Sequence, residues 1–151
     1  LGIVIGTVGL LLFLRIEPGG TYLNELLAPM VVVSVGMGLT FVPVTLIATS
    51  GIGHEEAGLA SGLFNTSQQV GGALGLAVLA TLATSRTTST IEDLGHPPNA
   101  ADQAQALVNG FHAAFLGGAI VVGAAGVLLL LLLRRKDVEA VGAGEPALAE
   151  G

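Results

Sequence analysis

Four long apolar stretches, separated by short polar segments, constrain the fold of this chain more than any other feature. They cover residues 1–14, 26–50, 57–83 and 111–133, and none contains Asp, Glu, Lys or Arg. As helices, the last three reach the roughly 20 residues needed to cross a bilayer, whereas the first would span only about 21 Å. We therefore predict an all-α membrane protein with four transmembrane helices, the first of them truncated.

The composition supports a bilayer environment and excludes several other classes of protein. Hydrophobic residues make up 52% of the chain and charged residues 11%, whereas soluble domains average about 25% charged residues. The formal net charge of −6 argues against a nucleic-acid partner, and the lack of cysteine excludes disulfides and thiolate metal sites. His54, His96 and His112 show no metal-ligand spacing. We expect no catalytic residue, metal or cofactor, and no enzymatic activity.

The segments between the apolar stretches are polar and rich in turn-forming residues. The longest, "TSRTTSTIEDLGHPPNAADQAQALVNG", joins the third stretch to the fourth. Pro97 and Pro98 prevent a continuous helix there, and Asn99 is placed to cap a helical segment that leads into the fourth stretch. We therefore expect a long connection between the last two transmembrane helices.

A basic cluster gives the predicted orientation. Arg134, Arg135 and Lys136 directly follow the last apolar stretch, and positive residues stay on the cytoplasmic side of a membrane. The prediction is a multi-pass protein of the cell membrane with a cytoplasmic C-terminus and a disordered acidic tail over residues 137–151. Because Leu1 already lies inside an apolar run, we also expect that an N-terminal part of the protein precedes this sequence.

The third stretch has two different faces when it is plotted as a helix at 100° per residue. One face, called here the amide face, carries small residues and carboxamides: Gly58, Ser61, Gly62, Asn65, Gln68, Gln69, Gly72 and Leu76. The opposite face, called the leucine face, is hydrocarbon: Leu59, Leu63, Val70, Leu74 and Ala77. Because lipid cannot satisfy an amide, the amide face should meet protein or water. Asn65, Gln68 and Gln69 are therefore candidates either for hydrogen bonds between helices or for the wall of a substrate cavity.

Glycine and proline suggest further roles within the apolar stretches. Small residues let membrane helices approach closely, and the candidates for such packing in the third stretch are Gly58, Gly62, Gly71, Gly72 and Gly75. Gly2 and Gly6 in the first stretch have the same four-residue spacing. Pro43 interrupts the hydrogen bonding of the second stretch and predicts a helix kink, either as a static bend or as a flex point.

The stretch "GMGLTFVPVTLIATSGIGHEEAGLASGLFNTSQQVGGALGLAVLATLATSRT", followed by "GFHAAFLGGAIVV", resembles the major facilitator superfamily. Within that superfamily it is similar to the fourteen-helix drug:proton antiporter branch. The resemblance implies that the four helices are the last four of a secondary transporter working by alternating access. It further implies export of lipophilic small molecules driven by protons, and partners that include membrane lipid and the remaining N-terminal helices. Proton-coupling carboxylates would then lie on that remaining part.

Two other classes of membrane protein are weighed against the transporter. A glycine-rich structural subunit of a membrane complex would explain the small residues without any transport activity. A proton-conducting ring subunit, however, needs a carboxylate within a span, and these spans have none. A membrane enzyme would require clustered His, Asp or Glu near the interface, and the sequence shows no such cluster.

Overall fold

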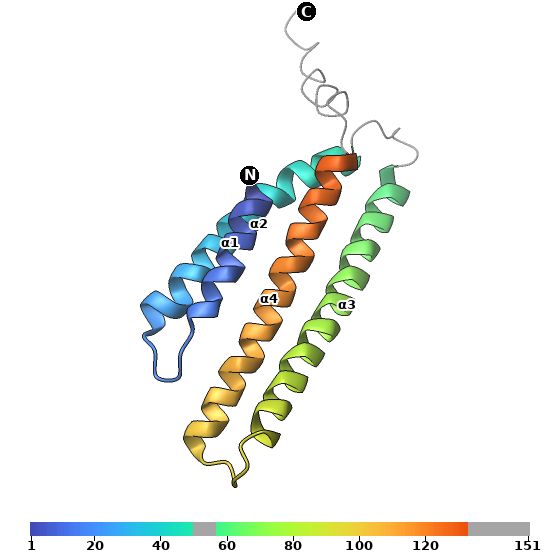
Figure 1. Ribbon diagram of the computed structural model, residues 1–151. Helices are drawn as coiled ribbons and strands as arrows, with labels where there is room; N and C mark the ends of the chain where they lie inside the picture. Colours follow the sequence, from blue (N-terminus) through green and yellow to red (C-terminus); the bar gives the residue numbers. More distant parts are fainter. Residues whose placement is uncertain (50–56, 133–151) are drawn as a thin grey trace, which may run out of the picture.

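The computed structural model describes residues 1–49 and 57–132, and the regular elements within them are all helices. The elements, in chain order, are α1 (Gly2–Leu12), a 3-10 turn η1 (Phe13–Arg15), a π-helical turn η2 (Tyr22–Leu27), α2 (Ala28–Thr49), α3 (Ala57–Glu92) and α4 (Ala100–Leu132). They form two antiparallel hairpins, α1–α2 and α3–α4, which meet where α1 packs on α4 (Figure 1). The basic cluster and the acidic tail lie outside the described residues.

Three helical segments are long and apolar enough to cross a membrane, namely Glu25–Leu46, Ala57–Glu92 and Ala100–Leu131. A shorter apolar helix covers Gly2–Arg15. Together they correspond to the four apolar stretches of the sequence, with the first too short to span by itself, as predicted. The predicted all-α membrane fold is therefore confirmed.

The connection between the last two spans is the main correction to the predicted organisation. Residues 84–92 are helical rather than turn-rich, whereas the helical segment expected over 100–110 is present as the start of α4; among the described residues of this connection, only the segment between Glu92 and Ala100 breaks the helix. With 36 residues, α3 is about 54 Å long, well beyond a hydrocarbon core of about 30 Å. The α3–α4 hairpin therefore extends far past the α1–α2 loop (Figure 1). We call the end with this turn the tip end and the opposite end, where α3 begins, the base end.

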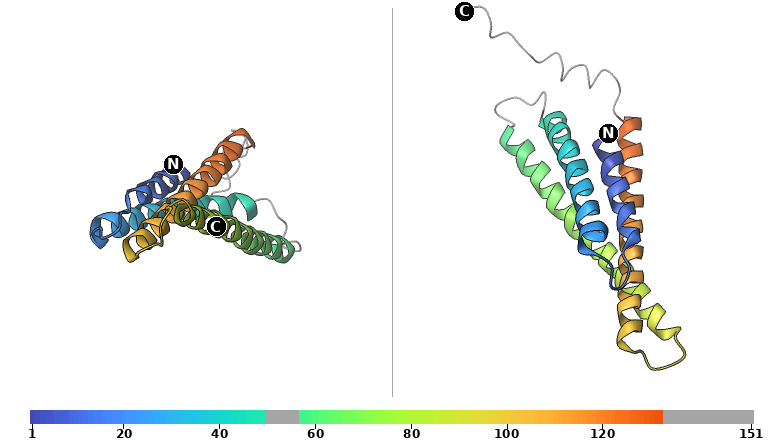
Figure 2. Two further views of the ribbon diagram at one scale, coloured as in Figure 1. Left: turned by 60° about the horizontal axis from the view of Figure 1, so that its bottom comes forward. Right: turned by 90° about the vertical axis from the view of Figure 1, so that its left-hand side faces the viewer.

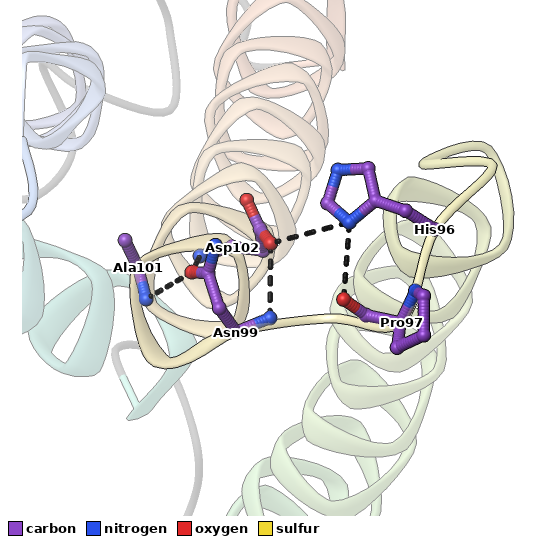
Figure 3. Close-up of polar contacts among 5 residues, drawn as sticks. All are labelled: His96, Pro97, Asn99, Ala101 and Asp102. Atoms are coloured by element: carbon purple, nitrogen blue, oxygen red, sulfur yellow. Dashed lines mark hydrogen bonds and ion pairs between the residues drawn. The ribbon is translucent and has the colours of Figure 1, made fainter.

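Asn99 starts α4 with a reciprocal set of hydrogen bonds (Figure 3). Its Oδ1 accepts from the backbone N–H groups of Ala101 (2.8 Å) and Asp102 (3.0 Å). The Asp102 carboxylate in turn accepts from the Asn99 N–H at 2.9 Å, which completes a capping box. His96 Nδ1 lies 3.9 Å from the same carboxylate. The capping role predicted for Asn99 is thus confirmed, and the Pro97–Pro98 pair lies in the break before it.

Substituting Asn99→Ala should fray the first turn of α4, because it removes an acceptor for two backbone donors. The expected cost is about 1 kcal/mol. Amide hydrogen exchange at Ala101 and Asp102 should speed up several-fold, measured by mass spectrometry or NMR. Gln103→Ala, at an exposed site in the same turn, is the matched control and should leave both rates unchanged. Equal exchange in the two variants would contradict the capping role.

Glycine brings α1 and α2 into backbone contact. Gly2, Gly6 and Gly9 are the buried residues of α1, and Gly6 faces Gly36 of α2. A Cβ added at Gly36 would lie 2.6 Å from the Gly6 Cα, and one added at Gly9 would lie 2.8 Å from the Val33 N. Because these neighbours are backbone atoms, they cannot move aside as a side chain would. The four-residue spacing of Gly2 and Gly6 therefore does mark a helix contact, as the sequence predicted.

The variant Gly36→Ala should push α1 and α2 apart and lower the free energy of unfolding by about 1–3 kcal/mol, the usual cost of overpacking. Gly38→Ala is the matched control, since Gly38 lies in the same helix and a Cβ there would meet nothing within 4 Å. That control should leave stability unchanged or raise it slightly through helix propensity. Thermal unfolding of the detergent-solubilised protein measures both. Similar losses in the two variants would argue against the backbone contact.

Candidate functional site

The candidate site is the amide face of α3, and the contacts of α3 with α4 show which way this face points. At the tip end, a Cβ added to Gly110 of α4 would lie 2.6 Å from the Ala83 carbonyl oxygen and would also clash with Thr87. Further along, Gly117 lies against Leu79 and Leu82 of α3. Leu79, Ala83 and Thr87 therefore mark the side of α3 that packs on α4.

The amide face is the continuation of this packing side towards the base end. At 100° per residue, Leu79, Ala83 and Thr87 all lie within about 40° of Asn65. The leucine face points the opposite way, and its side chains are strongly exposed, with Leu59 at 78% and Leu63 at 67%. By helical periodicity, Asn65 therefore lies on the side of α3 that packs on α4 at the tip end, and the leucine face lies on the opposite side.

At the level of the amides, however, α3 has separated from α4. The two helices cross near the tip end and diverge towards the base end in both views of Figure 2. A Cβ added at Gly58, Gly62, Gly71, Gly72 or Gly75 would meet nothing within 4 Å among the described residues. Asn65, Gln68 and Gln69 are all exposed. The face that packs tightly at the tip end is thus uncovered at the base end. We call the space between the diverging base-end halves of α3 and α4 the wedge.

Several threonine hydroxyls in the same helices are satisfied locally, whereas the three amides are not. Thr66 and Thr81 each donate to the carbonyl four residues earlier, at 2.8 Å, as Thr7 and Thr40 do in α1 and α2. This back-bonding removes the need for a partner in lipid. Asn65, Gln68 and Gln69 make no hydrogen bond to any described residue. Their bonding capacity is therefore available to whatever occupies the wedge.

The other wall of the wedge is apolar and comes from α4. Counted from Gly110, the α4 residues that share its direction are Val121, Ala124 and Leu128, each within about 40°. All three are exposed, Val121 at 61% and Leu128 at 57%. None of these side chains carries a charge suited to acid–base catalysis.

Other predicted residues are placed but not given a role by the described contacts. The five candidate packing glycines of α3 have no neighbour within 4 Å, so packing at them stays a prediction that requires helices outside the described residues. Pro43 lies within α2, and its role as a kink or flex point also stays a prediction. No group of three or more His, Asp or Glu side chains in residues 1–49 and 57–132 could hold a metal ion.

Two contacts of α4 were not predicted from the sequence. His112 Nε2 donates to the Ile16 carbonyl oxygen at 3.0 Å, and the Phe115 ring stacks on Phe13 with centroids 4.4 Å apart. The sequence signal was the position of His112 at the mouth of the last span, between Phe111 and Phe115. Such a position is typical of a histidine at the membrane interface, but it could not identify α1 as the partner.

Comparison with known proteins places this arrangement among transporters. The chain is 43% identical over 93 residues to the cephamycin export protein CmcT of Amycolatopsis lactamdurans, an alignment that covers 62% of this chain and 19% of that protein. It is 38% identical over 94 residues to the puromycin resistance protein pur8 of Streptomyces alboniger, covering 61% and 19%. It is also 41% identical over 69 residues to the MFS-type transporter EfpA of Mycobacterium tuberculosis, covering 46% and 13%. The resemblance to major facilitator drug exporters is confirmed.

The match to these major facilitator exporters is local. The chain spans about a fifth of the length of the first curated relatives it matches. No family model matches the chain, and no solved structure matches it. The helices described here therefore correspond to part of these larger relatives, and the alternative of a glycine-rich structural subunit has no support from them.

Water access to single cysteines tests the direction of the amide face. The chain has no native cysteine, so labels can be placed one at a time at 65, 68 and 69 and, as matched controls, at 63, 70 and 74. In the full-length protein in membranes, a water-soluble thiol reagent should label the amide-face positions at least several-fold faster. Equal labelling of the two sets would reject a solvated amide face.

Proposed function

We propose that this chain is the C-terminal part of a proton-coupled exporter of lipophilic small molecules, of the fourteen-helix branch, and that the amide face of α3 lines its substrate pathway. The proposal rests on three amides whose side chains have no hydrogen-bond partner among the described residues, and which by helical periodicity share the side of α3 that packs on α4. Buried in lipid, an unpaired amide costs a few kcal/mol. In a solvated pathway the same groups can bind the polar atoms of a substrate.

The proposed substrate class follows from the two walls of the wedge. Amides donate and accept hydrogen bonds without charge, and the α4 wall offers only hydrocarbon, so a lipophilic molecule with several polar atoms fits best. Two of the relatives are named for cephamycin export and puromycin resistance, which agrees with antibiotics as substrates of this protein. Alternating access would open the wedge to one side of the membrane at a time.

The remaining partners and the location belong to the same proposal. The protein resides in the cell membrane with the base end and the C-terminus on the cytoplasmic side. The remaining N-terminal helices of the transporter pack on the glycines of α3, and lipid contacts the leucine face. The four apolar stretches contain no carboxylate, so the protons are carried by residues of those other helices.

Efflux by the full-length protein in reconstituted vesicles tests the function. An imposed pH gradient should drive transport of dyes and antibiotics, and a protonophore should abolish it. Gln69→Ala should weaken transport of a bound substrate by roughly two- to ten-fold, the value of one hydrogen bond. Val70→Ala, on the leucine face, is the matched control and should stay within two-fold of the parent protein.

Two results would contradict the proposal. One is a full-length protein that moves no member of the panel under a pH gradient. The other is efflux from vesicles that contain only residues 1–151, because this chain has one side of the pathway and no proton-coupling group in its spans.

A further inference from the structure

One short segment of α4 contacts two different helices on its opposite sides. We call residues 110–117 the pivot segment. Gly110 and Gly117 face α3, whereas His112 and Phe115 face the end of α1. At 100° per residue, the two pairs point in roughly opposite directions around α4. The pivot segment is therefore the part of α4 that contacts both α3 and the end of α1, and α1 also contacts α4 further along, at Gly118 and Gly126.

The contacts towards α1 include both a hydrogen bond and an aromatic stack. Ile16 lies just beyond the 3-10 turn with extended dihedral angles, φ −65° and ψ 127°, so its carbonyl has left the helical ladder. His112 Nε2 supplies a donor for this carbonyl at 3.0 Å. One turn further along α4, Phe115 stacks on the buried Phe13 ring with an interplanar angle of 11°. These contacts fix the pivot segment to α1.

The contacts towards α3 are close at the tip end and end after a few turns. Gly110 lies against the Ala83 backbone, and Gly117 against Leu79 and Leu82. No residue of α3 is fully buried among the described residues, and from Val78 back to Ala57 only Ala60 and Phe64 are partly covered. The part of α3 that carries the amide face is thus held mainly from its tip end, with a few contacts to α2.

We propose that His112 is a positioning residue for transport, which anchors the pivot segment to α1 so that α3 swings about a fixed tip end. The inference rests on the proposed transport function, because the swing opens and closes the wedge lined by the amide face. His112 lies far from the amides along α4 and does not touch the substrate. Its effect is to keep the crossing point of α3 and α4 in place while the base end moves.

Spin-label distances in the full-length protein test the anchor. The labels are attached at Tyr22→Cys on η2 and Gln103→Cys on α4, both exposed positions, which we call the outer pair. The distance between these two labels, the outer distance, measures how far η2 lies from the start of α4. His112→Leu removes the donor, and the outer distance distribution should broaden, with roughly a five-fold rise in separated conformers. His112→Gln keeps an Nε2 donor and should restore the narrow distribution. Leu116→Ala, at an exposed site of the same segment, is the matched control and should have no effect.

Transport kinetics give a second readout. With the tip end loosened, His112→Leu should lower the maximal rate roughly five-fold and leave KM within two-fold, because the amide face is unchanged. His112→Gln should recover most of the rate. If His112→Leu does not accumulate in membranes, Phe115→Leu, which removes the stack on Phe13, replaces it in the distance measurement with the same expected broadening.

The outcomes separate this inference from the proposed function. An outer distance in His112→Leu that matches Leu116→Ala, or a His112→Gln variant that behaves like His112→Leu, would overturn the anchor. Broadening with rescue by glutamine, in a protein that transports nothing in the panel, would support the anchor as a conformational element and overturn the proposed function instead.

Discussion

Backbone contact at glycine is the interaction on which the arrangement of these helices depends. Lipid tails are as apolar as leucine side chains, so membrane helices gain little from burying leucine against each other and depend on close packing. Gly36 against Gly6 joins α1 to α2, and Gly110 against Ala83 joins α4 to α3. Where the glycines of α3 have no such neighbour, the helix separates from the bundle. Glycine contact thus holds α3 and α4 together at the tip end, whereas the glycines of α3 towards the base end meet no described neighbour.

The polar side chains of the helices divide into two groups with different consequences. Threonine hydroxyls such as those of Thr66 and Thr81 donate to the carbonyl four residues earlier, within their own helix. Carboxamides are too long and have too many donors and acceptors for that solution, and Asn65 and Gln69 make no bond to a described residue. These carboxamides need hydrogen-bond partners from another helix, from water or from a substrate. The functional proposal therefore rests on the amide face.

Several features could be predicted from the sequence because their causes are local. The break at Pro97–Pro98 follows from proline geometry, and the cap at Asn99 from a side chain that reaches its own helix terminus. The extension of α3 to Glu92 was not predicted, since residues 84–90 are mostly Ser and Thr, which favour helices weakly. In the structure that segment packs against α4 through the contact between Thr87 and Gly110, a tertiary contact that the sequence alone does not reveal.

The sequence by itself determined the apolar spans and the two faces of α3, because hydropathy and periodicity are properties of each segment alone. Only the tertiary structure decided which glycines meet a partner, since Gly2 and Gly58 begin the same four-residue pattern and only Gly2 has a close neighbour. It also decided that His112 reaches Ile16, 96 residues away in the chain. Such contacts depend on how whole helices cross, and crossing is set by the shapes of two surfaces together.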